Sequence, residues 1–167
     1  MPERPQKVSV LFVCMGNYCR SPTAEGVFRT VARERAPDFA IDIDSAGTHD
    51  YHVGKSPDPR SVEAAARRGI DLMPLRARQV ADEDFERFDY VLAMDRDNQA
   101  ALLARSPARA RDRVRLFMEF ADRPDMPEVP DPYYGGPAGF ELVLDLVEEA
   151  SHGLVTHLLE SRKARSR

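Results

Sequence analysis

Two residues of one short segment could together carry out chemistry on a phosphate ester. Arg20 follows Cys14 by six positions, within the run Val13-Cys14-Met15-Gly16-Asn17-Tyr18-Cys19-Arg20-Ser21-Pro22. A cysteine thiolate is a strong nucleophile, and the planar guanidinium of an arginine fits two phosphate oxygens at once. Because the chain contains 21 arginines, this spacing alone is a weak signal, and its interpretation depends on the elements that flank it.

The flanking sequence predicts that the segment joins a buried strand to a helix. Residues 8–13 form an apolar run rich in residues that favour strands, which is typical of a buried strand. Ser21 followed by Pro22 is typical of a helix start, with Ser21 as the N-cap and Pro22 at the first helical position. Since ligands of α/β proteins bind beyond the carboxyl ends of the strands, the segment lies where a site is expected.

The turn between strand and helix suits an anion. Backbone N–H groups at a helix N-terminus point toward a bound phosphate, and successive amides in such a turn form an anion-binding nest. Gly16 and Asn17 tolerate the left-handed backbone that this turn requires. The same positive field favours the thiolate form of Cys14, which we therefore expect to be nucleophilic at neutral pH. Ser21 can hydrogen-bond to that sulfur or cap the helix.

Both cysteines also have a plain structural interpretation. In that alternative, Cys14 is a buried thiol at the end of a strand and Arg20 is a surface charge. Cys19 by itself is equally consistent with a small buried residue at a helix start and with a chemical role.

Cleavage of a phosphate ester also needs a proton for the leaving oxygen, and Asp131 is the candidate donor. It lies in a long loop, residues 121–139, that contains five prolines and three glycines. Within it, Pro132 fixes the backbone beside the acid, and Tyr133 and Tyr134 offer aromatic walls for a flat substrate. Because the chain has 16 aspartates, spacing alone does not single out Asp131, and an Asp-Pro-Tyr turn is also a common structural feature.

The remaining pattern alternates strands with helices, which predicts one α/β domain with a parallel sheet covered on both faces. Asp58 followed by Pro59 begins a helix that Gly69 ends, and Asp82 is a candidate cap for a short helix through residue 88. The other expected elements are strands at 40–44, 90–94 and 114–117 and helices at 98–105 and from 140 onward.

Length and composition indicate an ordinary globular protein. The length of 167 residues predicts one domain, which we place at 8–160. We expect a flexible N-terminus at 1–7 and a basic flexible tail at 161–167. The net charge of −4 gives no reason to expect nucleic acid, and the longest apolar run is too short to span a membrane. The polar start predicts no signal peptide, and two cysteines form no disulfide framework, so we expect a cytoplasmic protein. Scarce lysine (3 against 21 arginines) is typical of a GC-rich bacterial genome.

On these residues the chain closely resembles the low-molecular-weight protein tyrosine phosphatase family. The family pattern V-C-x-G-N-x-C-R-S-P matches residues 13–22, and its D-P-Y-Y-G segment matches residues 131–135. Shorter matches lie between them, at residues 44–48, 77–79, 88–90 and 94–95. The resemblance covers roughly residues 7–160, and the two motifs in this order are highly specific.

The resemblance implies an α/β fold with a four-stranded parallel sheet and helices on both faces, flavodoxin-like and phosphotyrosine phosphatase I-like. It implies Cys14 as the nucleophile, Arg20 as the phosphate clamp, and Asp131 as the general acid and later base. The expected reaction passes through a cysteinyl-phosphate intermediate and uses no cofactor and no metal. The implied partners are phosphotyrosine proteins or peptides, with inorganic phosphate as a product inhibitor, and the implied state is a monomer or weak homodimer.

The resemblance also implies roles for residues around the nucleophile. Asn17 shapes the loop, supported by Ser21 and Ser45. The phosphate-binding residues are expected to be Met15, Gly16, Asn17, Tyr18, Cys19 and Arg20. The walls of the substrate cleft are expected to be Tyr18, Tyr51, Tyr133 and Tyr134.

The chain departs from the family pattern at two positions. Many relatives carry an aliphatic residue where this chain has Tyr18, which borders the pocket. Many also carry a histidine shortly before the segment at residues 77–79, at about the place of Leu75, and that histidine contributes to the network that holds the loop asparagine. The rate and the substrate preference are therefore open to change.

Three alternatives compete with a tyrosine phosphatase. A protein-arginine phosphatase on the same fold differs mainly at the Tyr18 position and in the acid loop. An arsenate reductase needs further thiols to pass a disulfide outward, and this chain has two cysteines. A non-catalytic phosphopeptide-binding module needs neither a nucleophile nor an acid, so the intact Cys14, Arg20 and Asp131 argue against it.

Overall fold

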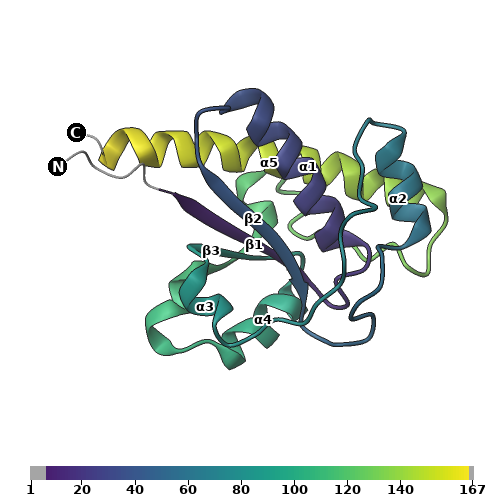
Figure 1. The fold of residues 1–167 in the computed structure, drawn as a ribbon, viewed down its shortest axis with the longest axis horizontal. Helices are drawn as coiled ribbons and strands as arrows, with labels where there is room; N and C mark the ends of the chain where they lie inside the picture. Colours follow the sequence, from purple (N-terminus) through teal and green to yellow (C-terminus); the bar gives the residue numbers. More distant parts are fainter. Residues whose placement is uncertain (1–6, 166–167) are drawn as a thin grey trace.

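A four-stranded parallel sheet forms the centre of the computed structural model, which describes residues 7–165 (Figure 1). Its strand order is β2-β1-β3-β4. The strands are β1 (Val8–Cys14), β2 (Ile41–Gly47), β3 (Tyr90–Ala93) and β4 (Val114–Leu116). All neighbouring strands pair in parallel, which confirms the predicted fold class. In this order β1 lies between β2 and β3, so the carboxyl end of β1 opens at the middle of one sheet edge.

Strand β1 is buried along its whole length because both faces of the sheet are covered. Val10 and Phe12 point into the larger core cluster, with the residues of the N- and C-terminal helices. Leu11 and Val13 point into a second cluster on the opposite face. The period of two along a strand thus explains why the sequence shows an unbroken apolar run rather than an alternation.

Helices lie on both faces of the sheet. The chain contains α1 (Arg20–Arg35), α2 (Pro59–Ala66), α3 (Asp84–Arg87), α4 (Arg96–Arg105) and α5 (Pro137–Arg165). Helices α1 and α5 pack on each other on one face, with α2 against α5, while α3 and α4 lie on the other (Figure 1). Two short 3₁₀ helices, η1 (Ala108–Arg113) and η2 (Phe117–Phe120), flank β4.

The expected helix starts were partly right. The Asp58 side chain accepts the Arg60 N–H at the start of α2, as the Asp-Pro pair predicted. Asp82 does not cap α3, which begins at Asp84 and follows Glu83 without a side-chain cap. At the other end of α2, Gly69 adopts a φ of 79°, consistent with its role as a stop.

Ser21 is not the N-cap of α1. The helix begins at Arg20, and the capping position is Cys19, which makes no side-chain hydrogen bond there. The hydroxyl of Ser21 instead contacts the sulfur of Cys14 and the side chain of Asn17. The serine that resembled a cap is therefore used by the loop in front of the helix.

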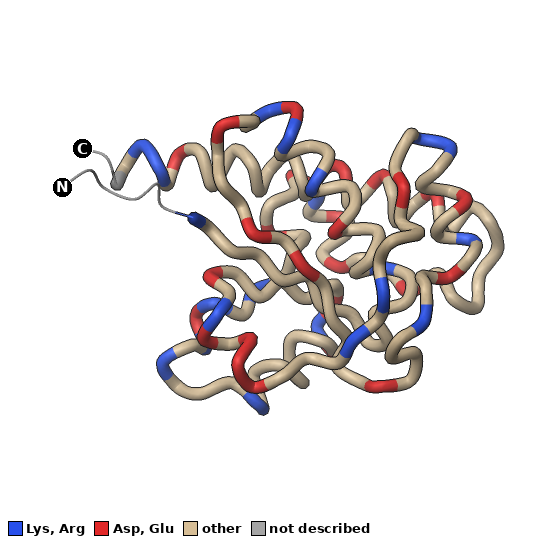
Figure 2. The backbone as a smooth tube through the Cα atoms, in the orientation of Figure 1, with Lys and Arg blue, Asp and Glu red and all other residues tan. Residues whose placement is uncertain are grey.

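Charges of both signs are spread along the chain (Figure 2). One group of ion pairs joins the turn after α2 to α5. Arg68 lies 2.6 Å from Glu141, 3.0 Å from Asp145 and 3.3 Å from Glu148.

Helix α5 continues to Arg165, through part of the stretch expected to be a basic tail. Residues 1–6 and 166–167 of the two expected flexible ends lie outside the described residues. No helix in residues 7–165 is long and apolar enough to cross a membrane.

We expect Phe12→Ala to lower the free energy of unfolding by about 3–5 kcal/mol, the usual range for deleting a buried phenylalanine ring. Phe12 is fully buried, and its ring packs edge-on against Phe28 at 5.5 Å and Phe117 at 4.9 Å, so neighbours cannot close the space without moving the sheet. Urea unfolding of both proteins measures the difference. A loss below about 1 kcal/mol would contradict a core centred on β1.

Candidate active site

The loop between β1 and α1 turns sharply at the carboxyl edge of the sheet. Cys14 is the last residue of β1 and is 3% exposed, and α1 begins at Arg20. Asn17, in the middle of the loop, has a φ of 52°, in the left-handed region. The chain therefore places the amides of the loop and the N-terminus of a 16-residue helix around the sulfur of Cys14.

The side chain of Asn17 is held at both ends. Its Nδ2 donates to Ser21 Oγ at 2.8 Å and to Ser45 Oγ at 3.0 Å, and its Oδ1 accepts the Arg78 N–H at 3.0 Å. Ser21 Oγ is also 3.0 Å from the Cys14 sulfur. The structure thus brings together Asn17, Ser21 and Ser45, the residues expected to shape the loop. Leu75, which stands where the resemblance led us to expect a histidine, packs at the edge of the larger core.

A buried carboxylate extends this network behind the loop. Ser45 Oγ donates to Glu25 Oε1 at 2.7 Å, so the Ser45 oxygen is free to accept from Asn17. The other oxygen of Glu25 pairs with Arg29 at 2.9 Å. Burial raises the pKa of Glu25, while its hydrogen bonds to Ser45 and Arg29 oppose that rise. The network therefore ends on a charge that depends on these two partners.

Arg20 is 2% exposed and is fixed by groups that sequence reasoning did not assign. Its Nη1 donates to Asp95 Oδ2 at 2.6 Å and to the Val129 carbonyl at 3.1 Å. Burial alone would lower the pKa of Arg20, but the nearby charges of Cys14 and Asp95 outweigh it and raise the pKa. The guanidinium thus stays charged near Cys14, in an orientation set by Asp95.

Asp131 reaches the same site from the loop before α5. Its Oδ2 lies 3.8 Å from Arg20 Nη2, and its Oδ1 accepts the Tyr133 N–H at 3.0 Å. Its side chain is 43% exposed, so it borders solvent. The structure therefore brings Asp131 to the mouth of the site that contains Cys14 and Arg20.

Cys14, Arg20 and Asp131 line one pocket of about 300 Å³. The other residues that line it are Met15, Gly16, Tyr18, Cys19, Tyr51, His52, Tyr133 and Tyr134. All four tyrosines expected in the substrate cleft border this pocket. Its floor is therefore the anion-binding loop, and its walls are aromatic, an arrangement that suits a phosphate carried on a flat ring.

His52 is a pocket residue that sequence reasoning missed. Its ring stacks on Tyr18 with centroids 4.0 Å apart and planes 11° apart, and Tyr133 lies 6.4 Å from Tyr18 on another side. Burial, and next the charge of Lys55, lower the pKa of His52, so the ring is neutral at pH 7. Tyr18 thus forms a two-ring wall of the pocket with His52.

Cys19 connects the loop to the start of α2. Its thiol lies 3.7 Å from Asp58 Oδ2, and Asp58 also pairs with Arg60 at 2.7 Å. Burial, together with the charge of Asp58, raises the pKa of Cys19, so it is a thiol and not a thiolate at neutral pH. Arg60 also donates to the Tyr133 carbonyl at 3.1 Å. This chain of contacts joins the phosphate-binding loop to the loop of Asp131.

The residues that were missed had partial signals in the sequence. Asp95, Arg78 and Gly47 lie in short matches to the family pattern, but nothing local assigned them a role. Glu25 looked like an ordinary polar residue of α1, and His52 like a residue of an exposed loop. Their contacts join segments far apart in the chain, which local pattern analysis does not detect.

Comparison with known proteins gives a consistent result over nearly the whole chain. Residues 9–164 match the family model for low molecular weight phosphotyrosine protein phosphatase. The chain is 35% identical to the low molecular weight protein-tyrosine-phosphatase YfkJ of Bacillus subtilis, covering 93% of this chain and 99% of that protein. It is 44% identical to the low molecular weight phosphotyrosine protein phosphatase of Schizosaccharomyces pombe, covering 81% and 86% respectively.

Comparison with solved structures points to the same family. The structure of a protein tyrosine phosphatase from Entamoeba histolytica, with Hepes in its active site, superposes with a TM-score of 0.89 at 39% identity. The match covers 93% of this chain and 99% of that one.

Gly47→Ala should lower kcat/KM about 10²-fold, the typical effect of displacing catalytic groups by about 1 Å. A Cβ at Gly47 would lie 2.8 Å from the Met15 carbonyl oxygen and 2.9 Å from the Asn17 nitrogen, both backbone atoms that move only with the loop. The measurement is steady-state hydrolysis of para-nitrophenyl phosphate. Gly136→Ala is the matched control, because a Cβ there meets no atom within 4 Å. Equal activity in the two variants would mean that the loop does not depend on its packing against Gly47.

Proposed function

The chain belongs to the low molecular weight phosphotyrosine protein phosphatase family, and on that premise we propose that it hydrolyses phosphotyrosine in proteins or peptides, and aryl phosphates, through a cysteinyl-phosphate intermediate. One observation carries the proposal. Cys14, Arg20 and Asp131, from two distant segments of the chain, line a single aromatic-walled pocket. A binding module needs the anion site, but it needs neither the nucleophile nor the acid.

In the first step, the amides of the loop and the guanidinium of Arg20 hold the phosphate above Cys14. The thiolate attacks phosphorus in line with the ester bond, the S–P bond forms and the P–O bond to the leaving group breaks. Asp131 gives its proton to the leaving oxygen, so that the product is a neutral phenol. Ser21, 3.0 Å from the sulfur, is positioned to hydrogen-bond to the thiolate.

In the second step, Asp131, now a carboxylate, takes a proton from water. The water oxygen attacks phosphorus, the S–P bond breaks, and inorganic phosphate leaves Cys14 as the thiolate again. The negative charge of both transition states falls on the loop amides and Arg20, which are held in place before the reaction by Asn17 and Asp95. The proposed steps use these side chains and water, without a metal or cofactor.

The walls of the pocket support the choice of substrate. Phosphotyrosine carries its phosphate on a ring far from the peptide backbone, so a slot with aromatic sides accommodates it better than phosphoserine. Tyr51, Tyr133, Tyr134 and the Tyr18–His52 pair supply such sides. Because the product is inorganic phosphate, the same loop should bind it and be inhibited by it.

We further propose a cytoplasmic location and a monomer or weak homodimer. Both cysteines of the chain are free and buried, which is in keeping with a reducing compartment.

Cys14→Ser should abolish turnover and retain phosphate binding, because the loop amides and Arg20 remain. Asp131→Ala should slow hydrolysis of aryl phosphates by about 10²- to 10⁴-fold, and less where the leaving group is already good. A series of aryl phosphates with different leaving-group pKa values measures the turnover of both variants, and calorimetric titration with inorganic phosphate measures binding to Cys14→Ser. Asp125→Ala is the control, since Asp125 lies in the same loop but pairs with Arg123 at the surface. Wild-type activity in Cys14→Ser would overturn the proposed mechanism.

Tyr18→Ile should change kcat/KM for a phosphotyrosine peptide by no more than about tenfold, because one aromatic contact contributes about 0.5–1.5 kcal/mol. The enzyme itself should prefer phosphotyrosine to phosphoserine and phosphoarginine in peptides of matched sequence. The comparison of kcat/KM on these peptides is the measurement. A faster rate on phosphoarginine would replace the substrate assignment and leave the chemistry of Cys14 unchanged.

A further inference from the structure

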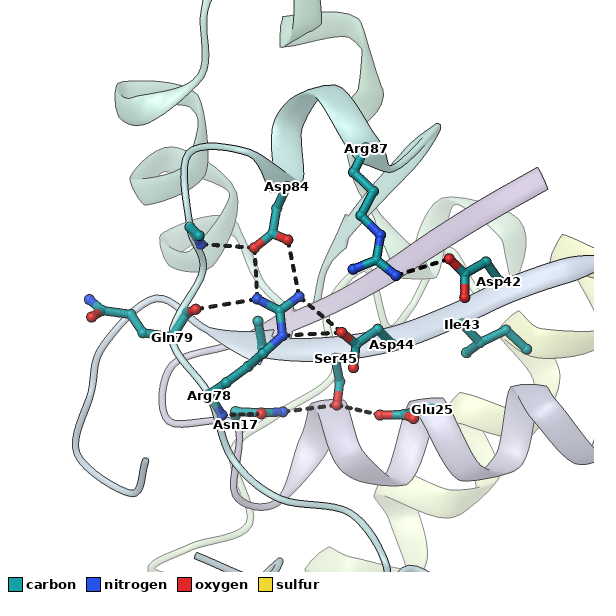
Figure 3. Close-up of polar contacts among 12 residues, drawn as sticks. Asn17, Glu25, Asp42, Ile43, Asp44, Ser45, Arg78, Gln79, Asp84 and Arg87 are labelled. Carbon is teal, nitrogen blue, oxygen red and sulfur yellow. Dashed lines mark hydrogen bonds and ion pairs between the residues drawn. The ribbon is translucent and has the colours of Figure 1, made fainter. Parts of the chain in front are cut away.

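Arg78 lies between two carboxylates on the far side of the phosphate-binding loop (Figure 3). Its Nε and Nη2 are 3.1 Å and 3.0 Å from Asp44 Oδ2, at the sheet. Its Nη1 and Nη2 are 2.8 Å and 3.1 Å from the two oxygens of Asp84, at the start of α3. The planar guanidinium therefore bridges β2 and α3, a geometry that a lysine cannot reproduce.

The ion pairs are fixed in position. Asp84 is 4% exposed and also accepts the Ala81 N–H at 2.8 Å, so its carboxylate has little freedom. Burial alone would lower the pKa of Arg78, but hydrogen bonds and charges from Asp84 and Asp44 raise it. The guanidinium is therefore charged throughout the ordinary pH range, and its two partners hold it in one place.

The main chain of the same residue touches the loop. The Arg78 N–H donates to Asn17 Oδ1 at 3.0 Å, and the Arg78 carbonyl accepts the N–H of Gly47 at 2.8 Å. A side chain that is anchored at two points thus fixes a backbone segment that contacts Asn17 directly (Figure 3).

Asn17 needs such contacts because its backbone is left-handed. A non-glycine residue with a φ of 52° persists where its surroundings over-determine it. The hydroxyls of Ser21 and Ser45 fix the nitrogen end of its amide, and Arg78 fixes the oxygen end. If the oxygen end were released, the amide could rotate about χ2 and lose its alignment with the hydroxyls.

We propose that Arg78 is a positioning residue of the phosphatase: its ion pairs with Asp44 and Asp84 hold the N–H that fixes Asn17, and through Asn17 they preset the loop for the transition state. The inference rests on the proposed role of the loop in catalysis. It differs from a purely structural role, in which Arg78 would serve to neutralise the buried Asp84.

Arg78→Lys and Asp44→Asn are the informative variants, because each loosens the bridge while leaving Asp84 in place. Both should lower kcat/KM for para-nitrophenyl phosphate by about three- to tenfold, the effect of weakening one or two hydrogen bonds. The inhibition constant of orthovanadate, which resembles the five-coordinate transition state, should rise by a similar factor. Arg87→Lys is the matched control, since Arg87 pairs at 3.1 Å with Asp42 of the same strand and does not touch the loop (Figure 3). It should stay within about twofold of the wild type.

A double-mutant cycle with Asn17→Gly decides between the two roles. Glycine tolerates the left-handed backbone but has no amide for Arg78 to hold, so Arg78→Lys should cause no further loss in the Asn17→Gly background. Losses that multiply would overturn the inference, because Arg78 would then act independently of Asn17. If Arg78→Lys fails to fold, Asp44→Asn in the same cycle gives the same decision. An inactive Cys14→Ser with multiplying losses would overturn this inference alone, whereas an active Cys14→Ser would overturn the proposed function.

Discussion

The left-handed backbone of Asn17 is the constraint on which the site depends. A loop of five residues must leave a buried strand, turn its N–H groups toward one point and enter a helix, and this turn puts Asn17 at a φ of 52°. Such a conformation costs free energy for any residue other than glycine. Three hydrogen bonds of the asparagine amide offset this cost: its nitrogen donates to two hydroxyls, and its oxygen accepts one backbone N–H. A glycine would adopt the turn readily, but it has no side-chain amide to hydrogen-bond to Ser45 of the sheet.

Charge imposes a second constraint, because a buried guanidinium is stable only with defined partners. Arg20 has Asp95 and the Val129 carbonyl behind it, so its remaining donors are available on the side of the pocket. Binding of a phosphate dianion then adds two negative charges where the protein has already placed a fixed positive one. The cost of ordering the arginine is met on folding rather than during each turnover.

Sequence patterns predicted the elements well where one local signal decides the outcome. The apolar run of β1, the Asp-Pro start of α2 and the four strands with their parallel order follow from periodicity and turn residues. The prediction that Ser21 caps α1 was wrong. A serine before a proline has the same local pattern whether it caps a helix or hydrogen-bonds to a sulfur. The roles of Asp95 and Arg78 could not be derived locally, because their partners Arg20 and Asn17 are 75 and 61 residues away in the chain.

Leu75 carries no titrating group, so the support of the loop responds to pH through other residues. A histidine in that network would titrate near neutrality. Here the oxygen end of Asn17 is held by a backbone N–H next to an arginine that stays charged, so this contact does not titrate. The group of this network that can lose its charge at acid pH is Glu25, whose pKa is raised chiefly by burial. As the pH falls through that raised pKa, Glu25 becomes neutral and its attraction for the Ser45 hydroxyl weakens. The support of the loop behind Asn17 therefore weakens as the pH falls, because Glu25 loses its charge.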